Sequence, residues 1–528
     1  MTSVVIGGNN TNAPLYTQFA QSLQVDATGK LRTAIPNNQW WYNSSVDKDG
    51  DFRIVEYFNG LSAQSIYVQD LANTLLTPGL SSTGYTIRQS RRYFKFFPGI
   101  GNQVFTTFNF CGADPNTVKR IGQFNQNSGL FWELSGSSFN IVVRRRAFDG
   151  TVVEDRINST AFNGDKLDGT GPSGLNFFAT TSATGLTYSS VTPVAYPNNT
   201  LSAYDVVYNT NGAPVSSFNT TSTVTVSGIT PSGYDGAAWI SNIGNGTITL
   251  TYPFNPGVHV SDNNVTLTQT PFHAEWTFWF DYFGGRSGKA RFVLATPSGP
   301  VILHTYSAAG RYGTQYVTDP SSPLREEIFN TATASYLPYF LGSSKSIDVE
   351  AETAINPLFV GATSSPNTWP TNTSHIEIPL IGFGLRTGEP YNRADLQLQS
   401  ITIIDVANLQ VGGVGGSTNS AFTWRLVFNP TLSGSIPTPK NAGKASRYWD
   451  YTTSAGYVSG GYTILQGTGI SNAVITVPQA LNYLNMGSDI FFQNPDQIVL
   501  LATQANPTGY APTNTMSLVA SLNWVEQL

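Results

Sequence analysis

The sequence holds four histidines, His259, His273, His304 and His375, whose side chains are the ones best suited to acid–base chemistry or metal binding near neutral pH. They are far apart in the chain, and none belongs to an H-x-x-H or H-x-E pattern that continues into a metal site. The one cysteine, Cys111, has no activating neighbour in its own segment and lies in the apolar run VFTTFNFC. We therefore predict structural or solvent-facing roles for the histidines and a buried, hydrophobic environment for the cysteine.

Two acidic stretches could hold a cation through clustered carboxylates. The first, DKDGD at residues 47–51, has its glycine misplaced for an EF-hand loop, and its twelfth position is Phe58 instead of glutamate, so we interpret it as an acidic turn. The second, DKLDGTGPSG at residues 165–174, combines Asp side chains that can cap exposed amides with glycines that permit left-handed backbone. A glycan or metal loop is one interpretation of this second stretch, and a rigid structural turn is the one we favour.

Hydrolysis of a glycoside needs two carboxylates that converge in space. Glu275 and Asp281 lie in an aromatic stretch that would suit the stacking of a sugar ring, although aromatic residues at alternate positions more often form a core. Gly288-Lys289 and Gly443-Lys444 resemble the end of a phosphate loop, yet each lacks the upstream glycine and has alanine where Ser or Thr must hold magnesium. The sequence therefore predicts no catalytic residue, no metal ligand and no cofactor, and a protein that is not an enzyme.

The elements that position these residues are predicted to be β-strands. Thr, Val, Tyr, Phe and Trp, which fit a pleated and half-buried surface, are abundant, and 50 Gly and 30 Pro supply turns. Strand-like runs recur at the short, regular spacing that is typical of a sandwich or jelly roll. Because 528 residues are too many for one compact core, the sequence predicts an all-β, multi-domain β-sandwich or jelly-roll protein with an inserted β-sandwich domain.

Shifts in composition divide the chain into four expected segments. These are an N-terminal arm at 1–40, a discontinuous β-sandwich body at 41–179 plus 271–410, an inserted Ig-like β domain at 180–270 and a C-terminal β domain at 411–528. The insertion stands out because Thr, Ser, Asn and Gly dominate it and Lys and Arg are almost absent. The glycine-rich VGGVGGSTNS at 411–420 is typical of a flexible link or long turn.

Charge limits the partners that the chain can have. Charged residues make up 11% of it, less than half of the usual share of about 25%. A free monomer with so little charge on its surface is poorly soluble, so we expect copies of the chain or neighbouring proteins to cover much of that surface. The net charge of −5 argues against nucleic acid as a partner, and we assign Arg144-Arg145-Arg146 to exposed strand edges or inter-subunit pairing. No stretch approaches the ~18 apolar residues that span a bilayer, and no secretory signal is visible.

Several stretches, in this order, resemble a family of virion-associated structural proteins of tailed phages, especially marine ones, and of large algal viruses. They are VDATGKLRTAIP, GYTIRQSRRYFKFFPGIGNQVFTTF, KRIGQFNQNSGLFWEL, VVRRRAFDG, DKLDGTGPSG, EWTFWFDYFGGRSGKARFVLATPSGPVILHTYS, TDPSSPLREEI and ASLNWVEQL. The resemblance covers about two-thirds of the chain. It departs from the family order at Ser322-Pro323-Leu324-Arg325, and residues 180–270 separate two motifs that adjoin in the family. The family contributes no catalytic residue to carry over.

The resemblance and the composition together lead to one functional hypothesis. We expect a virion structural protein, capsid-associated or part of a tail, neck or baseplate, that assembles through β-rich contacts. Its partners would be copies of itself, a trimer being one arrangement considered, and other virion proteins. The alternative is a host-attachment protein of a tail or fibre, whose inserted domain touches a surface glycan. A carbohydrate-active enzyme or lectin that acts alone is the competing class.

Overall fold

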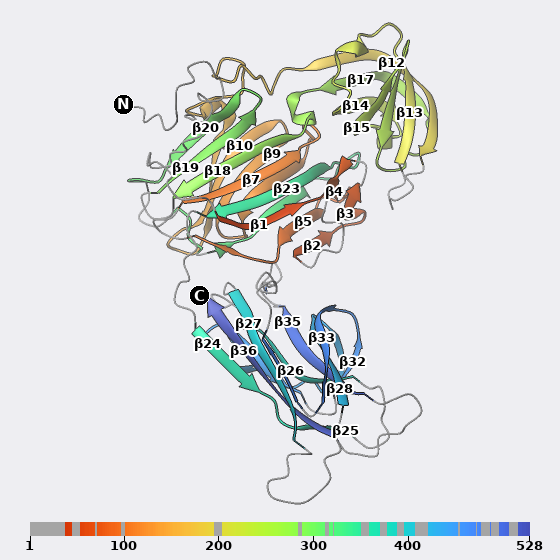
Figure 1. Ribbon diagram of the computed structural model, residues 1–528. Coiled ribbons are helices and arrows are strands. Elements are labelled where there is room, and N and C mark those ends of the chain that lie inside the picture. Colours follow the sequence, from red (N-terminus) through yellow and green to blue (C-terminus); the bar gives the residue numbers. More distant parts are fainter. Residues whose placement is uncertain are drawn as a thin grey trace, which may run out of the picture. The chain divides into compact units, whose positions relative to one another are not determined.

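The structure is a computed structural model, drawn in Figure 1. It describes residues 37–44, 53–68, 71–96, 101–194, 203–283, 288–311, 316–319, 321–349, 358–369, 377–387, 395–406, 421–451, 455–470, 472–476, 486, 496–505 and 516–527. Strands dominate these residues, which confirms the all-β, multi-domain fold. Contacts divide the chain into two units, the first made of Met1–Ser90 and Phe94–Glu352 and the second of Arg91–Tyr93 and Thr353–Leu528. The expected arm at 1–40 lies outside the described residues except for 37–40, which begin β1.

The body of the first unit consists of two antiparallel sheets. The eight-stranded sheet has the order β20-β19-β18-β7-β23-β4-β3, with β1 paired to β23. Its strands are β1 (Asn37–Asn43), β3 (Ala63–Val68), β4 (Asn73–Pro78), β7 (Gly101–Asn109), β18 (Trp276–Phe283), β19 (Lys289–Thr296), β20 (Gly299–Ser307) and β23 (Phe340–Val349). The seven-stranded sheet has the order β11-β10-β9-β8-β22-β5-β2. Its strands are β2 (Ile54–Asn59), β5 (Tyr85–Ser90), β8 (Thr117–Phe124), β9 (Gly129–Ser135), β10 (Ser138–Arg146), β11 (Val152–Asn158) and β22 (Leu324–Asn330).

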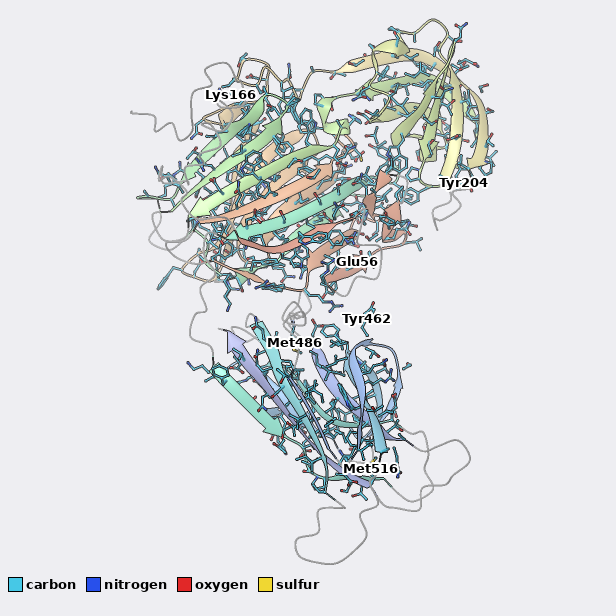
Figure 2. All side chains as sticks on the ribbon, in the orientation of Figure 1. Glu56, Lys166, Tyr204, Tyr462, Met486 and Met516 are labelled. Atoms are coloured by element: carbon cyan, nitrogen blue, oxygen red, sulfur yellow. The ribbon has the colours of Figure 1, made fainter. Side chains whose placement is uncertain are left out.

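Aromatic side chains fill the space between the two sheets. Figure 2 draws the side chains of the described residues on the ribbon. Trp132 on β9 stacks on Phe139 of β10 at 5.8 Å between ring centroids and meets Phe292 of β19 edge-on at 5.2 Å. Phe278 on β18 lies 4.8 Å from the same indole, so both sheets contribute to one cluster. Each fully buried aromatic side chain contributes on the order of 2–3 kcal/mol, which makes this cluster the main stabilising element of the body. A short pair, β6 (Phe94–Lys95) with β21 (Ser321–Ser322), and η2 (Ser159–Ala161) complete it.

Residues 181–269 form a barrel of six antiparallel strands in the order β12-β13-β16-β15-β14-β17. The strands are β12 (Thr181–Val194), β13 (Ala203–Asn209), β14 (Thr223–Thr230), β15 (Gly236–Ile243), β16 (Thr247–Tyr252) and β17 (Ser261–Gln269), with short turns η3 (Val215–Ser217), η4 (Ser232–Tyr234) and η5 (Pro271–His273). The sequence set this segment apart as an Ig-like domain. The hydrogen bonds between its strands instead close into one ring, so none of the six described strands is a free edge.

A small apolar cluster attaches the barrel to the body. Leu75, Cys111 and Leu341 of the body and Ala203 and Ala237 of the barrel are all buried in it. The Tyr339 hydroxyl of the body donates to the Ala237 carbonyl at 2.8 Å. Because buried apolar contacts and a hydrogen bond cross this junction, the barrel is a packed part of the first unit and not a domain on a loose tether.

The second unit is built on one eleven-stranded antiparallel sheet in the order β24-β36-β27-β34-β33-β28-β35-β26-β31-β30, with β25 paired to β36. Its strands are β24 (Leu358–Thr363), β25 (Asn367–Trp369), β26 (Ile378–Leu385), β27 (Asp395–Asp405), β28 (Ala421–Phe428), β30 (Lys440–Asn441), β31 (Ser446–Asp450), β33 (Tyr462–Ile470), β34 (Asn472–Thr476), β35 (Gln497–Gln504) and β36 (Met516–Gln527). β29 (Thr431–Gly434) pairs separately with β32 (Ala455–Ser459).

The boundary expected near residue 410 differs from the structure. Residues 358–405 were assigned to the body, but β27 pairs along its length with β36, the last strand of the chain. Ile401 and Ile403 of β27 are buried in the same core as Trp524, so these strands belong to the second unit. The glycine-rich stretch at 411–420, expected to be a link, lies outside the described residues.

Candidate functional site

The seven-stranded sheet carries an unusual set of side chains on the face that points away from the aromatic core. Residues alternate along each strand: on β9, for example, Trp132 enters the core while Glu133 points the other way. Seven charged residues on this second face pair with one another, and we call them the ion-pair layer. They are Arg120, Glu133, Arg144, Glu154, Arg156, Arg325 and Glu327.

Strand register places opposite charges directly across from one another in the ion-pair layer. Glu133 on β9 lies opposite Arg120 on β8, which in turn lies opposite Glu327 on β22. Arg120 Nε donates to Glu133 Oε2 at 2.8 Å, and its Nη1 donates to Glu327 Oε1 at 2.9 Å. Arg325 Nη2 lies 2.6 Å from Glu327 Oε2. Both oxygens of the Glu327 carboxylate are therefore paired with a guanidinium group.

Phenylalanine rings separate the arginines of this layer. The Arg120 guanidinium lies 5.2 Å from the Phe131 ring centroid and 4.8 Å from that of Phe329. Arg144 approaches Phe131 in the same way, at 4.9 Å. Planar guanidinium groups stack well on aromatic faces, so the rings and the charges form one packed layer.

The electrostatics of the layer are dominated by its arginines. Burial favours the neutral form of Glu327 and would raise its pKa, but Arg325, Arg120 and Arg144 outweigh that effect and lower the pKa from 4.5 to about 2. With its pKa at about 2, this carboxylate stays ionised near neutral pH although Glu327 is only 5% exposed. A carboxylate that is ionised and fully paired is poorly suited to act as a general acid or base near neutral pH.

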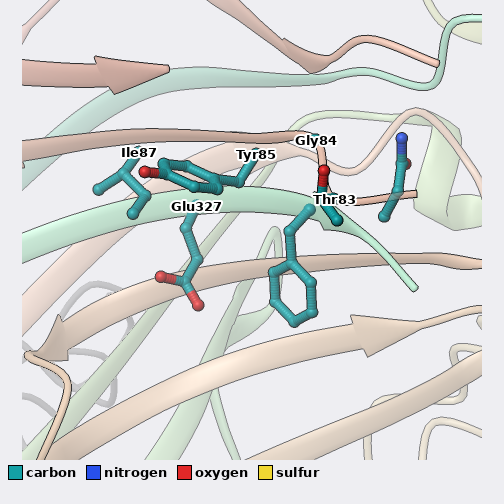
Figure 3. A pocket seen from close by; sticks show the side chains of 7 residues that line it. Thr83, Gly84, Tyr85, Ile87 and Glu327 are labelled. Carbon is teal, nitrogen blue, oxygen red and sulfur yellow. The ribbon is translucent and has the colours of Figure 1, made fainter. Parts of the chain in front are cut away.

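A hollow of about 250 Å³ lies beside the ion-pair layer (Figure 3). We call it the aromatic hollow, and it is lined by Thr83, Gly84, Tyr85, Ile87, Glu327, Phe329 and Asn330. Tyr85 and Phe329 face each other across neighbouring strands, and Ile87 and Glu327 form the next cross-strand pair. Because Glu327 already has two arginine partners, the hollow offers mainly apolar and aromatic walls to an incoming group.

The barrel carries a smaller polar cluster around His259. The imidazole stacks on the Tyr188 ring at 4.0 Å between centroids, with an angle of 5° between the planes. Its Nε2 lies 2.8 Å from Asp262 Oδ1, while Asp262 Oδ2 accepts a hydrogen bond from the Tyr188 amide at 3.0 Å. The flanking Val258 and Val260 are 84% and 70% exposed. A histidine fixed in this way between exposed apolar residues could contact a ligand, although it has no nucleophile beside it among these residues.

One face of the second unit carries a continuous patch without charged residues; among the described residues, the one charged residue that strand register places at its border is Asp395, the first residue of β27, which lies opposite Gln527. This uncharged face extends over β24, β36, β27 and β34, on the side away from the core. Its residues are Phe359, Gly361, Thr363, Ser400, Thr402, Ile404, Val474, Thr476, Ser517, Val519, Ser521, Asn523 and Val525. Short hydrogen bonds tie neighbouring strands together there, such as the one between the Thr363 and Ser521 hydroxyls at 2.7 Å. Phe359 and Val474 are 75% and 74% exposed.

The two other described histidines have structural partners. His273 Nε2 bonds to the Thr225 hydroxyl at 2.8 Å, and burial lowers its pKa to about 4. His304 Nδ1 accepts from the Asn163 amide at 3.2 Å, and burial again lowers the pKa to about 4. Cys111 is fully buried, and desolvation raises its pKa to about 12, as expected for an unreactive thiol. His375 lies outside the described residues.

The DKLDGTGPSG stretch is a rigid turn in the structure. Asp165 is fully buried, and its carboxylate accepts hydrogen bonds from the Leu167 amide at 2.8 Å and the Ser173 amide at 2.7 Å. Gly171 is required because a side chain there would collide with that carboxylate, 2.3 Å away. Asp168 caps the Thr170 amide at 2.9 Å. Both Asp side chains are satisfied by the loop itself, which agrees with the structural interpretation that we favoured.

The two carboxylates considered for glycoside hydrolysis do not converge. Glu275 directly precedes β18 and accepts from Asn73 at 3.1 Å, while Asp281 is buried and paired with Arg291. Six residues along an extended strand are about 20 Å apart, whereas the reaction needs carboxylates separated by about 5–9.5 Å. The geometry of this pair therefore does not suit that chemistry.

The phosphate-loop resemblance has a different explanation at Gly443-Lys444. The amides of Lys444, Ala445 and Ser446 donate to the carboxylate of Glu526, at 2.9, 3.2 and 2.8 Å. The loop thus does bind an anion, but that anion is the buried carboxylate of its own chain. At Gly288-Lys289, the glycine accepts from the Ala308 amide and the exposed lysine begins β19.

The interpretation of Arg144-Arg145-Arg146 as an exposed edge or an inter-subunit pair needs correction. β10 lies between β9 and β11, and Arg144 is buried and paired within its own chain to Glu154. Arg145 lies 3.9 Å from Asp155.

The DKDGD stretch falls outside the described residues. Within the described part of the chain no three His, Cys, Asp or Glu side chains are grouped to hold a metal ion, and no helix has the length and apolarity to cross a membrane.

The ion-pair layer was not predicted from the sequence, although a signal for it exists. Charges in VKRIGQF, LFWELS and LREEI alternate with apolar residues at the two-residue period of a strand. What the period cannot supply is the register that brings Arg120 opposite both Glu133 and Glu327.

In comparisons with known proteins, no protein-family model and no curated protein matches this chain.

Proposed function

We propose that the chain is a structural subunit of a virus particle that assembles with copies of itself and with other virion proteins. The observation that carries the proposal is the uncharged face, where four adjacent strands present Thr, Ser, Asn and apolar side chains and, apart from Asp395 at its border, no charged residue among the described residues. Such a face is poorly suited to permanent exposure, because charge is what keeps soluble proteins apart. It is well suited to burial against another subunit, where it meets no like-charge repulsion.

Three further observations support the same proposal. The ordered motifs of the sequence resemble those of virion-associated proteins. Buried aromatic cores and the ion-pair layer make a rigid body, which suits a building block. The carboxylate pair considered for catalysis is separated, and His273 and His304 are engaged in structural contacts.

The test is to look for the chain in purified particles. An antibody raised against the purified chain should label mature virions from the source culture, and mass spectrometry should find the chain there in fixed proportion to the major coat protein. A chain that is found only outside particles, as a free monomer, would contradict the proposal.

A host-attachment role is the second candidate, because of the exposed loop of the barrel. Val258 and Val260 present apolar side chains on either side of the stacked His259–Tyr188 pair, and a flat ring beside Asp262 suits contact with a sugar. Replacing Val258 and Val260 with serine should lower adsorption of particles to host cells while leaving assembly intact. Unchanged adsorption would remove this candidate.

A further inference from the structure

Two oppositely charged side chains, Glu326 on β22 and Lys345 on β23, lie between the two sheets of the body. Side chains alternate along a strand, so Glu326 shares its face of β22 with Leu324, and Lys345 shares its face of β23 with Ile347. Leu324 and Ile347 both belong to the aromatic core. Lys345 Nζ lies 3.1 Å from Glu326 Oε1, and the two side chains are 0% and 3% exposed. The body therefore encloses an ion pair that joins its two sheets.

The ammonium group of Lys345 has few partners. It meets the Glu326 carboxylate at an angle that does not suit a hydrogen bond, and no other acceptor bonds to it among the described residues. The centre of the Tyr42 ring lies 5.6 Å from the same nitrogen. Lys119, which is also buried, is the contrasting case, because its Nζ lies 2.5 Å from Asp114 Oδ2 and donates to two backbone carbonyls at 2.6 and 3.0 Å. The protein thus solvates the ammonium group of Lys119 and leaves that of Lys345 poorly solvated.

Burial in this setting favours the neutral form of Lys345. The removal of two charges from water is offset only when good geometry and further hydrogen bonds satisfy the protons, and these are missing at Lys345. Desolvation by burial lowers the pKa of Lys345; the Glu326 carboxylate opposes this effect, and the nearby Arg88 adds to it. A desolvated lysine whose pKa is lowered is a nucleophile.

The carboxyl carbon of Glu326 is within reach of that nucleophile. Because a carbon–oxygen bond is about 1.2 Å long, a nitrogen 3.1 Å from Oε1 is at most about 4.3 Å from Cδ. Reacting atoms are about 3–3.5 Å apart in a near-attack arrangement, so a shift of about 1 Å in the lysine side chain is sufficient. Arg88 lies opposite Glu326 on β5, and its positive charge stabilises the negative charge that develops on the carboxyl oxygen during attack.

We propose that Lys345 and Glu326 of one chain form an isopeptide bond. The ammonium group first passes one proton to the carboxylate, which gives a neutral amine and a carboxylic acid. The nitrogen then attacks Cδ, so that a C–N bond forms and the bond from Cδ to the hydroxyl oxygen breaks. Of the three ammonium protons, one stays on the amide nitrogen and two leave with that oxygen as water. The product carries no charge and ties β22 to β23, and so one sheet of the body to the other.

The first test is the mass of the intact, denatured chain. The loss of one water should make the wild type about 18 Da lighter than its sequence requires. Lys345→Met has a side chain of similar length without an amine, so this variant should keep the full mass of its own sequence. Comparison of the two chains, made in the same way, cancels any processing at the chain ends. A wild-type chain of full mass would overturn the inference, whether or not the variant folds.

Digestion with trypsin locates the bond. Trypsin cleaves after unmodified lysine, so cleavage after Lys345 should be lost, and residues 326–386 should stay in one peptide that is about 18 Da too light. Asp114 and Lys119 are the matched control: their ion pair is shorter, but its lysine is well solvated, so the peptide that contains both should keep its full mass. Cleavage after Lys345 in the bulk of the wild-type protein, or loss of water at Asp114 and Lys119 instead, would contradict the inference.

The isopeptide bond goes beyond the proposed function and does not depend on it, because the reaction needs only the folded chain. A wild-type chain of full mass would leave the proposed place in a virus particle untouched. A chain that carries the bond but is absent from particles would overturn the proposed function alone.

Discussion

Replacing Glu327 with glutamine removes the carboxylate on which Arg120 and Arg325 converge. The variant keeps the size of the side chain and one acceptor oxygen, so the main change is the loss of charge. Two buried guanidinium groups then lose a partner, which is the costly way to break a buried ion pair. We expect Glu327→Gln to lower the free energy of unfolding of the first unit at neutral pH.

The size of the effect follows from the pKa of Glu327. The pKa falls from 4.5 to about 2 in the folded protein, and each pH unit corresponds to about 1.4 kcal/mol, so the carboxylate contributes about 3 kcal/mol. Because the folded pKa is the lower one, this contribution is complete above about pH 4.5. It is lost as the pH falls from there toward about 2, where the carboxylate is protonated in both states.

Urea titrations followed by tryptophan fluorescence, at a series of pH values from 7 downward, measure this difference. The gap between the wild type and Glu327→Gln should be about 3 kcal/mol down to about pH 4.5 and should then shrink. Glu275→Gln is the control: Glu275 is an exposed carboxylate with one hydrogen bond to Asn73, and its replacement should cost less than about 0.5 kcal/mol. A gap below about 1 kcal/mol at pH 7, or one that does not change with pH, would refute the reasoning.

Three other changes test separate parts of the fold. Burial lowers the pKa of His273 to about 4, so its contribution to the free energy of unfolding is complete above about pH 6.5 and is lost as the pH falls toward 4. In urea titrations, His273→Gln should therefore remove up to about 3 kcal/mol of the pH dependence of that free energy. Gly467→Ala would place a methyl group 2.7 Å from the Trp424 ring, so the second unit should lose about 1–3 kcal/mol, measured as a lower melting temperature. Cys111 is buried with its pKa raised to about 12, so maleimide should label it in urea but not in the native chain, as mass spectrometry would show.

Composition was sufficient to predict the fold class, because strand-forming residues and turn residues are signals that local sequence carries. The same holds for Cys111, whose apolar surroundings in VFTTFNFC indicated burial before any contact was known. The low-charge segment at 180–270 stood out in composition, and the closed barrel occupies Thr181–Gln269. Whether six such strands close into a ring or form two sheets depends on pairing between β12 and β17 at the ends of the segment, which no local pattern specifies.

The boundary between the units was harder to predict, because strand pairing ignores distance along the chain. β27 and β36 are more than a hundred residues apart in sequence, yet they form one of the longest ladders in the structure. Composition hardly changes at residue 353, whereas the glycine-rich stretch at 411–420 attracts a boundary. The ion-pair layer escaped notice for the same reason, since its charges meet only when β8, β9 and β22 are in register.

The barrel junction decides how a role for the inserted segment can be tested. Deleting residues 180–270 would uncover Leu75, Cys111, Tyr339 and Leu341 of the body, all of which are at most 2% exposed with the barrel in place. An exposed apolar patch of this kind promotes aggregation, so failure of the deleted chain to assemble would say nothing about attachment. The serine substitutions at Val258 and Val260 avoid the problem because both side chains already face solvent. Attachment and assembly can therefore be separated in this chain by surface substitutions and not by removal of the barrel.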